Sequence, residues 1–406
     1  MKRYWKLLAI AFITVLVIGT FYIQKSTASN SYPQFVITKV SGNENEVKNV
    51  VIPGDYSLDG YMPNDFQMNE KGTNYVSDMS FIERQAGWHL PTEIKRLQKE
   101  YRNFMRGKQE EVSLFYEDQS VLAYAIIPWN YSTQINGEIS FDIEIYDKES
   151  GKVTKINEVL PQNQKYNYAS IYDVQIFNGK LKVVASVDLN GEEMNTTEIH
   201  LYTFDLKTQS LIGDNIIQAM ERQNSDDIST NISVLIDHEN INQQKYVLFE
   251  KQTFKEVPYE DGFTSEVISR ELALYNLETN KQEKITLPEE LLGRSIEGAI
   301  LTDSTIYFYN VTDSKLEIIP YQIEGNKIGT KQSFDIGTDE HSTPIIEIKN
   351  NRLFILSPFK DHDTNGTIMI TDVNTGNILY EGTIEAENAS KLKKGYRLDF
   401  YSLEIE

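Results

Sequence analysis

Apolar and polar residues alternate along this chain in short runs, and five stretches repeat one pattern. Each stretch has an alternating apolar run, a polar turn and a second such run. The stretches are residues 143–155, 201–213, 272–284, 318–330 and 370–382. Alternation with a period of two is typical of β-strands with one buried face, and a polar turn between two such runs predicts a β-hairpin. We therefore expect five hairpins.

The turns of these hairpins contain residues suited to short loops. An Asp or Asn side chain that opens a turn can accept a hydrogen bond from the backbone two residues on. Such residues are Asp147, Asp205, Asn276 and Asp372. Residues that tolerate a positive φ close the turn. These are Gly151, Asn280, Asn326 and Gly376. In the second hairpin Gln209 holds this place and suits it least.

Two further apolar runs precede each hairpin, so the repeating unit has four strands. Successive units start at intervals comparable to the repeat length of known propellers, and five units fill residues 111–385. One four-stranded sheet cannot bury both of its faces alone, and four-stranded antiparallel units at this period are typical of a β-propeller. The predicted fold class is therefore all-β, with about six blades.

The two ends of the chain supply the sixth blade in this prediction. Three apolar runs lie near the start, at residues 34–40, 48–53 and 75–81, and one ends the chain at 396–406. Strands from both termini would close the ring and leave no sheet edge exposed.

Two segments have a helical pattern instead. Residues 92–106 place apolar side chains on one helical face, with Thr92 suited to cap the helix and Gly107 suited to end it. A shorter helix is expected at residues 214–222.

Residues 1–28 form a segment that we expect to direct export. An uncharged run, Leu7 to Ile23, follows a basic start and is at the lower limit of length for spanning a bilayer. Aromatic residues flank the run as in a membrane-spanning helix, and the basic residues before it predict a cytoplasmic N-terminus. We predict a single-pass anchor in the cell membrane, with residues 29–406 as one extracytoplasmic propeller domain.

Two alternatives to the retained anchor stay open. Cleavage after Ala28 by signal peptidase would give a secreted protein, because small residues precede the cut at suitable spacing. The run could also be a buried core helix.

Composition narrows the possible partners. The chain contains no cysteine, which excludes disulfides, thiolate metal sites and a cysteine nucleophile. Residues 1–28 carry four basic and no acidic side chains, so 35 basic and 60 acidic side chains remain in the rest, a net charge of −25. Such a domain repels polyanions, so we expect no nucleic-acid partner.

The fifth hairpin resembles a known repeat. Residues 372–380, DVNTGNILY, are similar to the Asp-x-x-Thr-Gly turn of quinoprotein-like propeller repeats, with Asp372, Thr375 and Gly376 in place and Tyr380 where that family has Trp. The other copies fit less well. The resemblance implies a propeller fold and no particular activity, because the family includes cofactor-dependent dehydrogenases and non-catalytic assembly factors.

The sequence offers few candidates for catalytic residues. The sequence has no GxSxG, HExxH, phosphate-loop or dinucleotide motif, and its five histidines are scattered without an i,i+4 pair. We therefore assign no catalytic residue. Each histidine is expected to be a surface or packed residue.

One stretch matches a calcium loop in part. Asp361, Asp363 and Asn365 offer oxygen ligands at alternate positions, and Gly366 permits the sharp turn that follows. Asp372 would complete the twelve-residue pattern, but a strand over 367–372 would carry it about 20 Å away. The prediction is a weak calcium site completed by backbone carbonyls and water; the alternative is an ordinary polar hairpin loop. No other cofactor is expected.

Trp129 and Tyr131 follow an apolar run in a predicted loop. Aromatic residues on a propeller loop can anchor a partner, although such a Trp more often packs over a neighbouring blade.

These observations favour one function over two others. We expect an exported, membrane-tethered propeller that binds a protein or another envelope component of a bacterial cell without catalysis. The first alternative is an enzyme acting on envelope glycans through carboxylates gathered at the propeller hub. The second is a quinone-dependent oxidoreductase.

Overall fold

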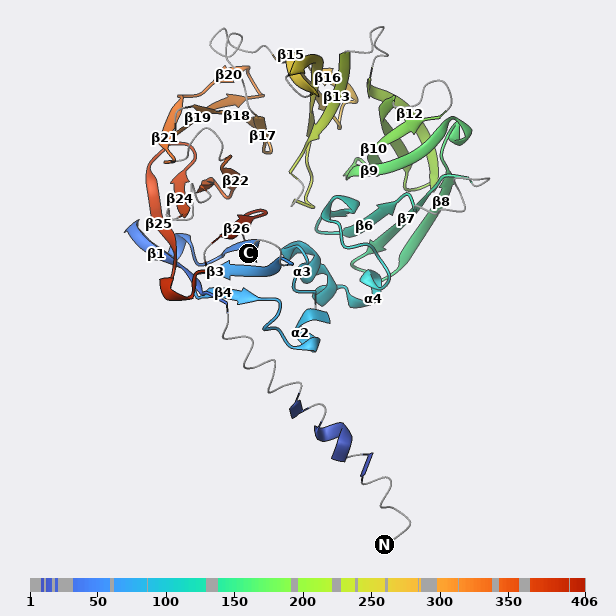
Figure 1. Cartoon of the computed structure of the whole chain (residues 1–406). Coiled ribbons are helices and arrows are strands. Elements are labelled where there is room, and N and C mark those ends of the chain that lie inside the picture. Colours follow the sequence, from blue (N-terminus) through green and yellow to red (C-terminus); the bar gives the residue numbers. More distant parts are fainter. Residues whose placement is uncertain are drawn as a thin grey trace. The chain divides into compact units, whose positions relative to one another are not determined.

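The computed structural model consists mainly of antiparallel β-sheet (Figure 1). It describes residues 9–10, 12–16, 19–20, 32–58, 62–85, 87–128, 138–190, 196–220, 228–237, 240–259, 262–283, 285, 298–312, 314–337, 343–357, 366–393 and 395–405. The chain forms two compact units. Unit 1 contains Met1–Thr92, Val311–Glu317 and Gln332–Glu406, and unit 2 contains Glu93–Asn310 and Ile318–Lys331.

Three sheets of four consecutive strands make up most of unit 2. The first holds β5 (Phe115–Glu117), β6 (Val121–Ile126), β7 (Ser140–Asp147) and β8 (Val153–Val159). The second holds β9 (Tyr166–Phe177), β10 (Lys180–Leu189), β11 (Thr197–Asp205) and β12 (Ser210–Ala219). The third holds β13 (Ile228–Leu235), β14 (Tyr246–Tyr259), β15 (Gly262–Asn276) and β16 (Lys281–Glu283). Each strand pairs with its neighbour in the sequence, as predicted.

Two further sheets follow the same order. One holds β17 (Gly298–Leu301), β18 (Thr305–Thr312), β19 (Lys315–Gln322) and β20 (Lys327–Ile328), and β21 (Gln332–Asp335) pairs with β19. The other holds β22 (Ile345–Lys349), β23 (Arg352–Ser357), β24 (Gly366–Asp372) and β25 (Ile378–Ala386). All five predicted four-strand units are therefore present in the described part of the chain.

The sixth sheet joins the two ends of the chain. Strand β2 (Val50–Leu58) pairs with β3 (Asn64–Asn69), which pairs with β4 (Gly72–Tyr75). On its other edge β2 pairs with β26 (Tyr396–Phe400) and with β27 (Glu404–Ile405). The predicted pairing of C-terminal with N-terminal strands is confirmed.

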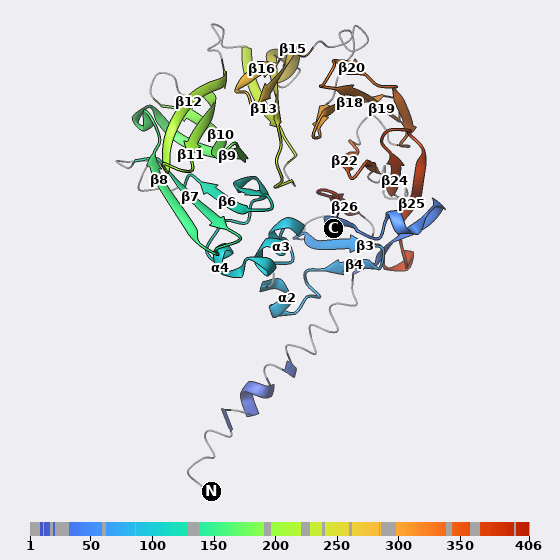
Figure 2. The ribbon, with the colours of Figure 1, turned by 180° about the vertical axis from the view of Figure 1, so that it is seen from behind.

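Two details of that prediction were wrong. Residues 34–40 do not enter the sixth sheet: β1 (Phe35–Gly42) pairs with β25 as a fifth strand of the preceding sheet (Figure 2). Residues 75–81 are mainly a turn, and β3 and β4 take the place expected for that strand. Strand partners are chosen by packing across the whole unit, which a local pattern does not record.

The hairpin turns form as expected. In the fifth hairpin Oδ1 of Asp372 accepts hydrogen bonds from the backbone N–H of Asn374 (3.1 Å) and Thr375 (2.9 Å), and Gly376 has φ +71°. Asp147, Asp205 and Asn276 accept from their own turns in the same way. Gln209 has φ +56°, so the least suited sequence still makes the turn.

The helical segments are only partly as predicted. Residues 92–106 form two short helices, α3 (Thr92–Glu100) and α4 (Arg102–Met105), which bury Ile94, Leu97, Phe104 and Met105, while α2 (Phe81–Gln85) precedes them. Thr92 is the first helical residue rather than a cap, and its buried hydroxyl has no hydrogen-bond partner. Gly107 follows α4 with φ +79°, as expected of a residue that ends a helix. The helix predicted at 214–222 is wrong, because residues up to 219 form β12.

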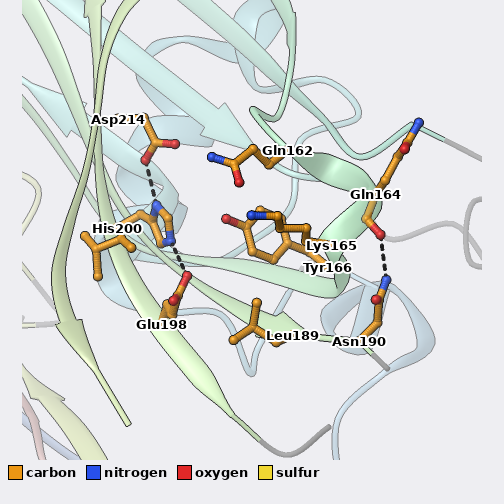
Figure 3. Close-up of a pocket in the computed structure, with 10 residues that line it drawn as sticks. Gln162, Gln164, Lys165, Tyr166, Leu189, Asn190, Glu198, His200 and Asp214 are labelled. Atoms are coloured by element: carbon orange, nitrogen blue, oxygen red, sulfur yellow. Dashed lines mark hydrogen bonds and ion pairs between the residues drawn. The ribbon is translucent and has the colours of Figure 1, made fainter. Parts of the chain in front are cut away.

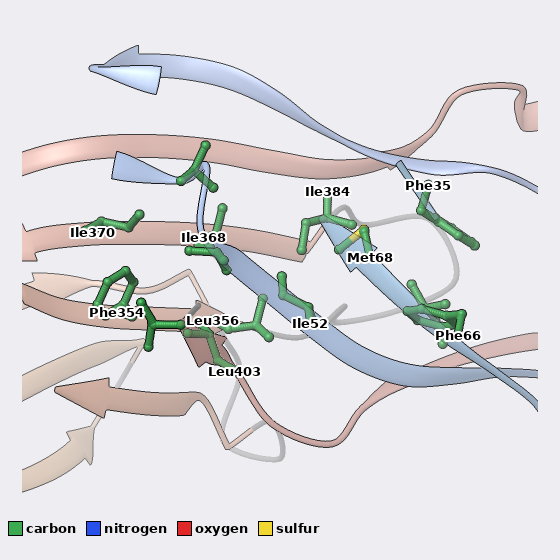
Figure 4. Packing of buried hydrophobic residues seen from close by; sticks show 14 of the residues in the cluster. Phe35, Ile52, Phe66, Met68, Phe354, Leu356, Ile368, Ile370, Ile384 and Leu403 are labelled. Carbon is green, nitrogen blue, oxygen red and sulfur yellow. The ribbon is translucent and has the colours of Figure 1, made fainter. Parts of the chain in front are cut away.

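Apolar side chains between neighbouring sheets form the cores. In unit 1 one cluster joins the β1/β22–β25 sheet to the β2–β4/β26 sheet, with Phe35, Ile52, Phe66, Leu356 and Ile368 almost fully buried (Figure 4). In unit 2 corresponding clusters join the β9–β12 sheet to the β13–β16 sheet, and that sheet to the strands that follow it. Paired sheets thus bury the faces that a single sheet would expose.

In the part of the chain that the structure describes, no helix has the length and apolarity needed to cross a bilayer.

Glu117 fixes helix α3 to the first sheet of unit 2. Its carboxylate accepts hydrogen bonds from Lys148 (2.6 Å), Tyr101 (2.8 Å) and Arg96. Burial alone would raise the pKa of Glu117, but the three donors outweigh burial and lower it. The carboxylate therefore stabilises the fold above its ordinary pKa, and this contribution is lost as the pH falls through the lowered value.

We expect Glu117→Gln to lower the free energy of unfolding by about 2 kcal/mol at neutral pH, because a buried charged acceptor is lost. The difference from wild type should shrink in urea titrations repeated at about pH 4. Glu100→Gln is the matched control, because Glu100 also binds Arg96 but is half exposed. Equal losses in the two variants would contradict this role for Glu117.

Candidate binding pocket

A pocket of about 470 Å³ lies beside the β9–β12 sheet in unit 2 (Figure 3). Its residues come from the β8–β9 connection, the start of β9, the end of β10, and the neighbouring strands β11 and β12. The lining consists of Gln162, Gln164, Lys165, Tyr166, Leu189, Asn190, Glu198, His200, Asp214 and Ile216. A volume of this size is within the range of small-molecule sites, although the lining is more polar than in most of them.

His200 is held between two carboxylates. Alternation along β11 puts Glu198 and His200 on one face, and β12 brings Asp214 beside them. Nδ1 of His200 lies 2.6 Å from Oδ1 of Asp214, and Nε2 lies 3.1 Å from Oε2 of Glu198. The imidazole is 2% exposed, whereas the two carboxylate side chains are about one-fifth exposed. The buried ring therefore holds two carboxylates in place, and both carboxylates reach the pocket.

These two contacts limit how protons can be distributed among the imidazole and the two carboxyl groups. A carboxylate only accepts hydrogen bonds, and a neutral imidazole donates only one. Both contacts can be hydrogen bonds at the same time only when the ring carries two protons or when one carboxyl group is protonated. In either case neither ring nitrogen is left for a ligand.

Aromatic rings fix the orientation of His200. The ring of Tyr202 is stacked on it with centroids 5.3 Å apart, and Tyr166 meets it edge to face at 5.9 Å. Burial, together with the charges of Glu198 and Asp214, raises the pKa of Tyr166 to about 12. The Tyr166 hydroxyl consequently keeps its proton at neutral pH and remains a hydrogen-bond donor.

Hydrogen bonds to backbone carbonyls hold the loop on the other side of the pocket in place. Asn190 donates from its backbone N–H to the carbonyl of Lys165 and from Nδ2 to the carbonyl of Gln164, each at 2.8 Å. Gln162 adopts φ +54°, which is unusual for a residue other than glycine. Figure 3 shows the side chains of Gln162, Tyr166 and His200 around the same space.

The site residues expected from the sequence are not among those that the structure describes. Asp361, Asp363 and Asn365 of the calcium loop, and Trp129 and Tyr131 of the aromatic loop, are outside the described residues. Asp372 ends strand β24, and its carboxylate accepts hydrogen bonds from the backbone of the hairpin turn. Within the described ranges no group of three or more His, Cys, Asp or Glu side chains could hold a metal ion.

Sequence reasoning misses His200. In the sequence it is one of five scattered histidines, and its partner Asp214 lies in a segment whose pattern suits a helix that does not form. One signal is present, because the alternation of β11 puts Glu198 and His200 on a common face.

Comparison with known proteins gives a likeness of fold at most. No protein-family model matches the sequence, and no curated protein matches it. Among solved structures, an acylaminoacyl peptidase in complex with Z-Gly-Gly-Phe-chloromethyl ketone is 9% identical, with 87% of this chain and 46% of that chain covered and a TM-score of 0.33. A structure from an analysis of two prolyl endopeptidases is 8% identical, with coverages of 85% and 50% and a TM-score of 0.32. The β-propeller domain of the Trilobed protease from Pyrococcus furiosus is 10% identical, with coverages of 86% and 95% and a TM-score of 0.27.

This chain spans about half the length of the first two of these proteins. With TM-scores well below 0.5, the likeness assigns neither an activity nor a ligand to it.

Proposed function

We propose that the chain is an exported, membrane-tethered β-propeller that works as a non-catalytic interaction or sensing module on the outside of a bacterial cell. The uncharged run of residues 7–23 behind a basic start supports export. The series of four-stranded sheets, with the C-terminal strands paired to β2, supports a propeller. The pocket beside β11 is the recognition site in this proposal.

One observation favours binding over catalysis. Both ring nitrogens of His200 are engaged by protein carboxylates, so the imidazole is not free to exchange a proton with a substrate. The pocket lining also contains no Ser, Thr or Cys among the described residues, so a hydroxyl or thiol nucleophile activated by the histidine is absent from that lining. His200 holds two carboxylates in place.

An envelope-glycan-acting enzyme is the second candidate. Glu198 and Asp214 both line the pocket, and glycoside hydrolysis uses a pair of carboxylates. Incubation of the purified protein with peptidoglycan distinguishes the two functions. We expect no release of reducing ends above the level of Glu198→Gln, and release that this substitution abolishes would establish the enzyme instead.

The proposed location has its own test. We expect the intact protein in the membrane fraction, and protease added to whole cells should digest residues 31–406. Recovery of a soluble form that starts near Ser29 would show that the chain is cleaved after Ala28 and is not tethered.

A further inference from the structure

We infer that the pocket beside β11 binds a neutral, hydroxyl-rich ligand, a saccharide unit, through Glu198, Asp214, Gln162 and Tyr166. The inference rests on the proposed function, in which this pocket is the recognition site, and names the class of ligand. Its support comes from the charges, the hydrogen-bonding groups and the shape of the lining.

The charges of the lining favour a neutral ligand. Two carboxylates, Glu198 and Asp214, would repel an anion. A cation would meet Lys165 in the same lining, and would also meet His200 if the ring is doubly protonated. No single sign of charge prevails, so the pocket lacks the strong field that would select an ion.

The hydrogen-bonding groups match hydroxyls, which both donate and accept. The imidazole occupies Oε2 of Glu198 and Oδ1 of Asp214, so the second oxygen of each carboxylate remains as an acceptor. Donors are the side-chain amide of Gln162 and the phenol of Tyr166, whose raised pKa keeps its proton in place. A mixed set of donors and acceptors satisfies adjacent hydroxyls better than it satisfies an ammonium group, which only donates.

The pocket wall also contains apolar side chains that suit the faces of a sugar ring. Tyr166 and Leu189 are buried in the pocket wall, and Ile216 is 56% exposed at its side. Pyranose rings present C–H groups on their faces, and an aromatic and aliphatic wall can cover these while polar side chains bind the edges.

The polar groups are also held in position before a ligand arrives. His200 fixes both carboxylates, and the two hydrogen bonds from Asn190 fix the loop that carries Gln164 and Lys165 (Figure 3). Groups that are already ordered lose little entropy on binding, which is required for neutral ligands that offer no strong charge interaction.

The experiment is ligand-observed saturation-transfer NMR on the full-length protein in detergent, with maltose, cellobiose and chitobiose as probes and lysine as the cation. We expect at least one disaccharide to bind with a Kd of about 1 mM and lysine not to bind. Gln162→Ala and Tyr166→Phe should each raise that Kd about tenfold, since each removes one hydrogen bond to the ligand.

Matched controls are Gln282→Ala and Tyr168→Phe. Gln282 is exposed in β16, Tyr168 is 41% exposed two residues after Tyr166, and neither lines the pocket. Both controls should leave the Kd unchanged. Thermal melting of all four variants confirms that each is folded.

Three results would overturn the inference: no disaccharide binds, lysine binds in their place, or the pocket variants bind sugar as well as the controls do. None of these three results contradicts the proposal that the protein is a non-catalytic module. Conversely, the appearance of new anomeric signals from a cleaved disaccharide would overturn the non-catalytic function and leave the saccharide site standing.

Discussion

Deletion of residues 396–406 is expected to abolish cooperative folding of unit 1. The deletion removes β26 and β27, both of which pair with β2. It also removes four buried core residues, Tyr396, Leu398, Leu403 and Ile405. Burial of such side chains contributes about 2 kcal/mol each, so their loss is on the order of 8 kcal/mol. That is comparable with the whole stability of a typical domain, about 5–15 kcal/mol.

Limited proteolysis with mass spectrometry is the appropriate measurement, because it reports on each unit. Residues 35–75 and 345–386 should become sensitive to protease in the truncated protein. Leu403→Ala should show a milder form of the same effect, with a loss of about 3 kcal/mol. Arg397→Gln is the control, because Arg397 is an exposed residue of β26. Continued protection of residues 35–75 after truncation would show that the C-terminal strands do not complete the sheet.

Asp173→Asn is expected to stabilise unit 2 above neutral pH. Asp173 lies in β9 and is 4% exposed. Its Oδ1 accepts hydrogen bonds from the backbone N–H of Val174 (2.8 Å) and from Nε2 of Gln175 (3.0 Å), whereas Oδ2 is buried without a partner. Burial raises the pKa of Asp173 to about 7 despite these two bonds. The ionised form is therefore the costly one in the folded state.

The direction of the pH dependence follows from this raised pKa. Below the ordinary pKa the acid is protonated in both the folded and the unfolded state, and it costs no stability. As the pH rises toward 7, the unfolded chain ionises first, so the free energy of unfolding falls. A pKa raised from 3.8 to about 7 corresponds to a loss of about 4 kcal/mol once the pH exceeds 7. Asparagine keeps the accepting oxygen and does not titrate.

Thermal melts of wild type and Asp173→Asn at about pH 5 and pH 8 test this expectation. The variant should have the higher Tm at pH 8, and the difference should be clearly smaller at pH 5, where only part of the loss has developed because the pH is closer to the ordinary value of 3.8. Glu266→Gln, at an exposed position of β15, should give no such pH-dependent difference. A constant offset at both pH values would show that Asp173 does not titrate as its surroundings require.

The hairpins could be predicted from sequence because their determinants are local. Asp372 and Gly376 are four residues apart, and both make the turn by their own conformational preferences. The later part of strand β12, residues 214–219, could not be predicted, since Ile216, Ile217 and the adjacent Met220 also suit a helix and only pairing with β11 decides the outcome. The pocket could not be predicted from the sequence for a similar reason. His200 and Tyr166 are brought together by the register of a sheet, and that register appears nowhere in a local pattern.

The pairing of the chain's ends has a consequence for synthesis and transport. Thr38 faces Thr383, and Val50 faces Ile405, so the first strands of unit 1 find their partners in segments that are synthesised much later. Unit 2 lies between them in the sequence, interrupted only by Val311–Glu317 of unit 1. If the chain is exported as proposed, the early strands cross the membrane before β25 and β27 and stay without these partners until those strands have followed. Long-range closure of this kind is slow and exposes strand edges. A chaperone that shields residues 35–58 until β25 and β27 are available would therefore raise the yield of folded protein.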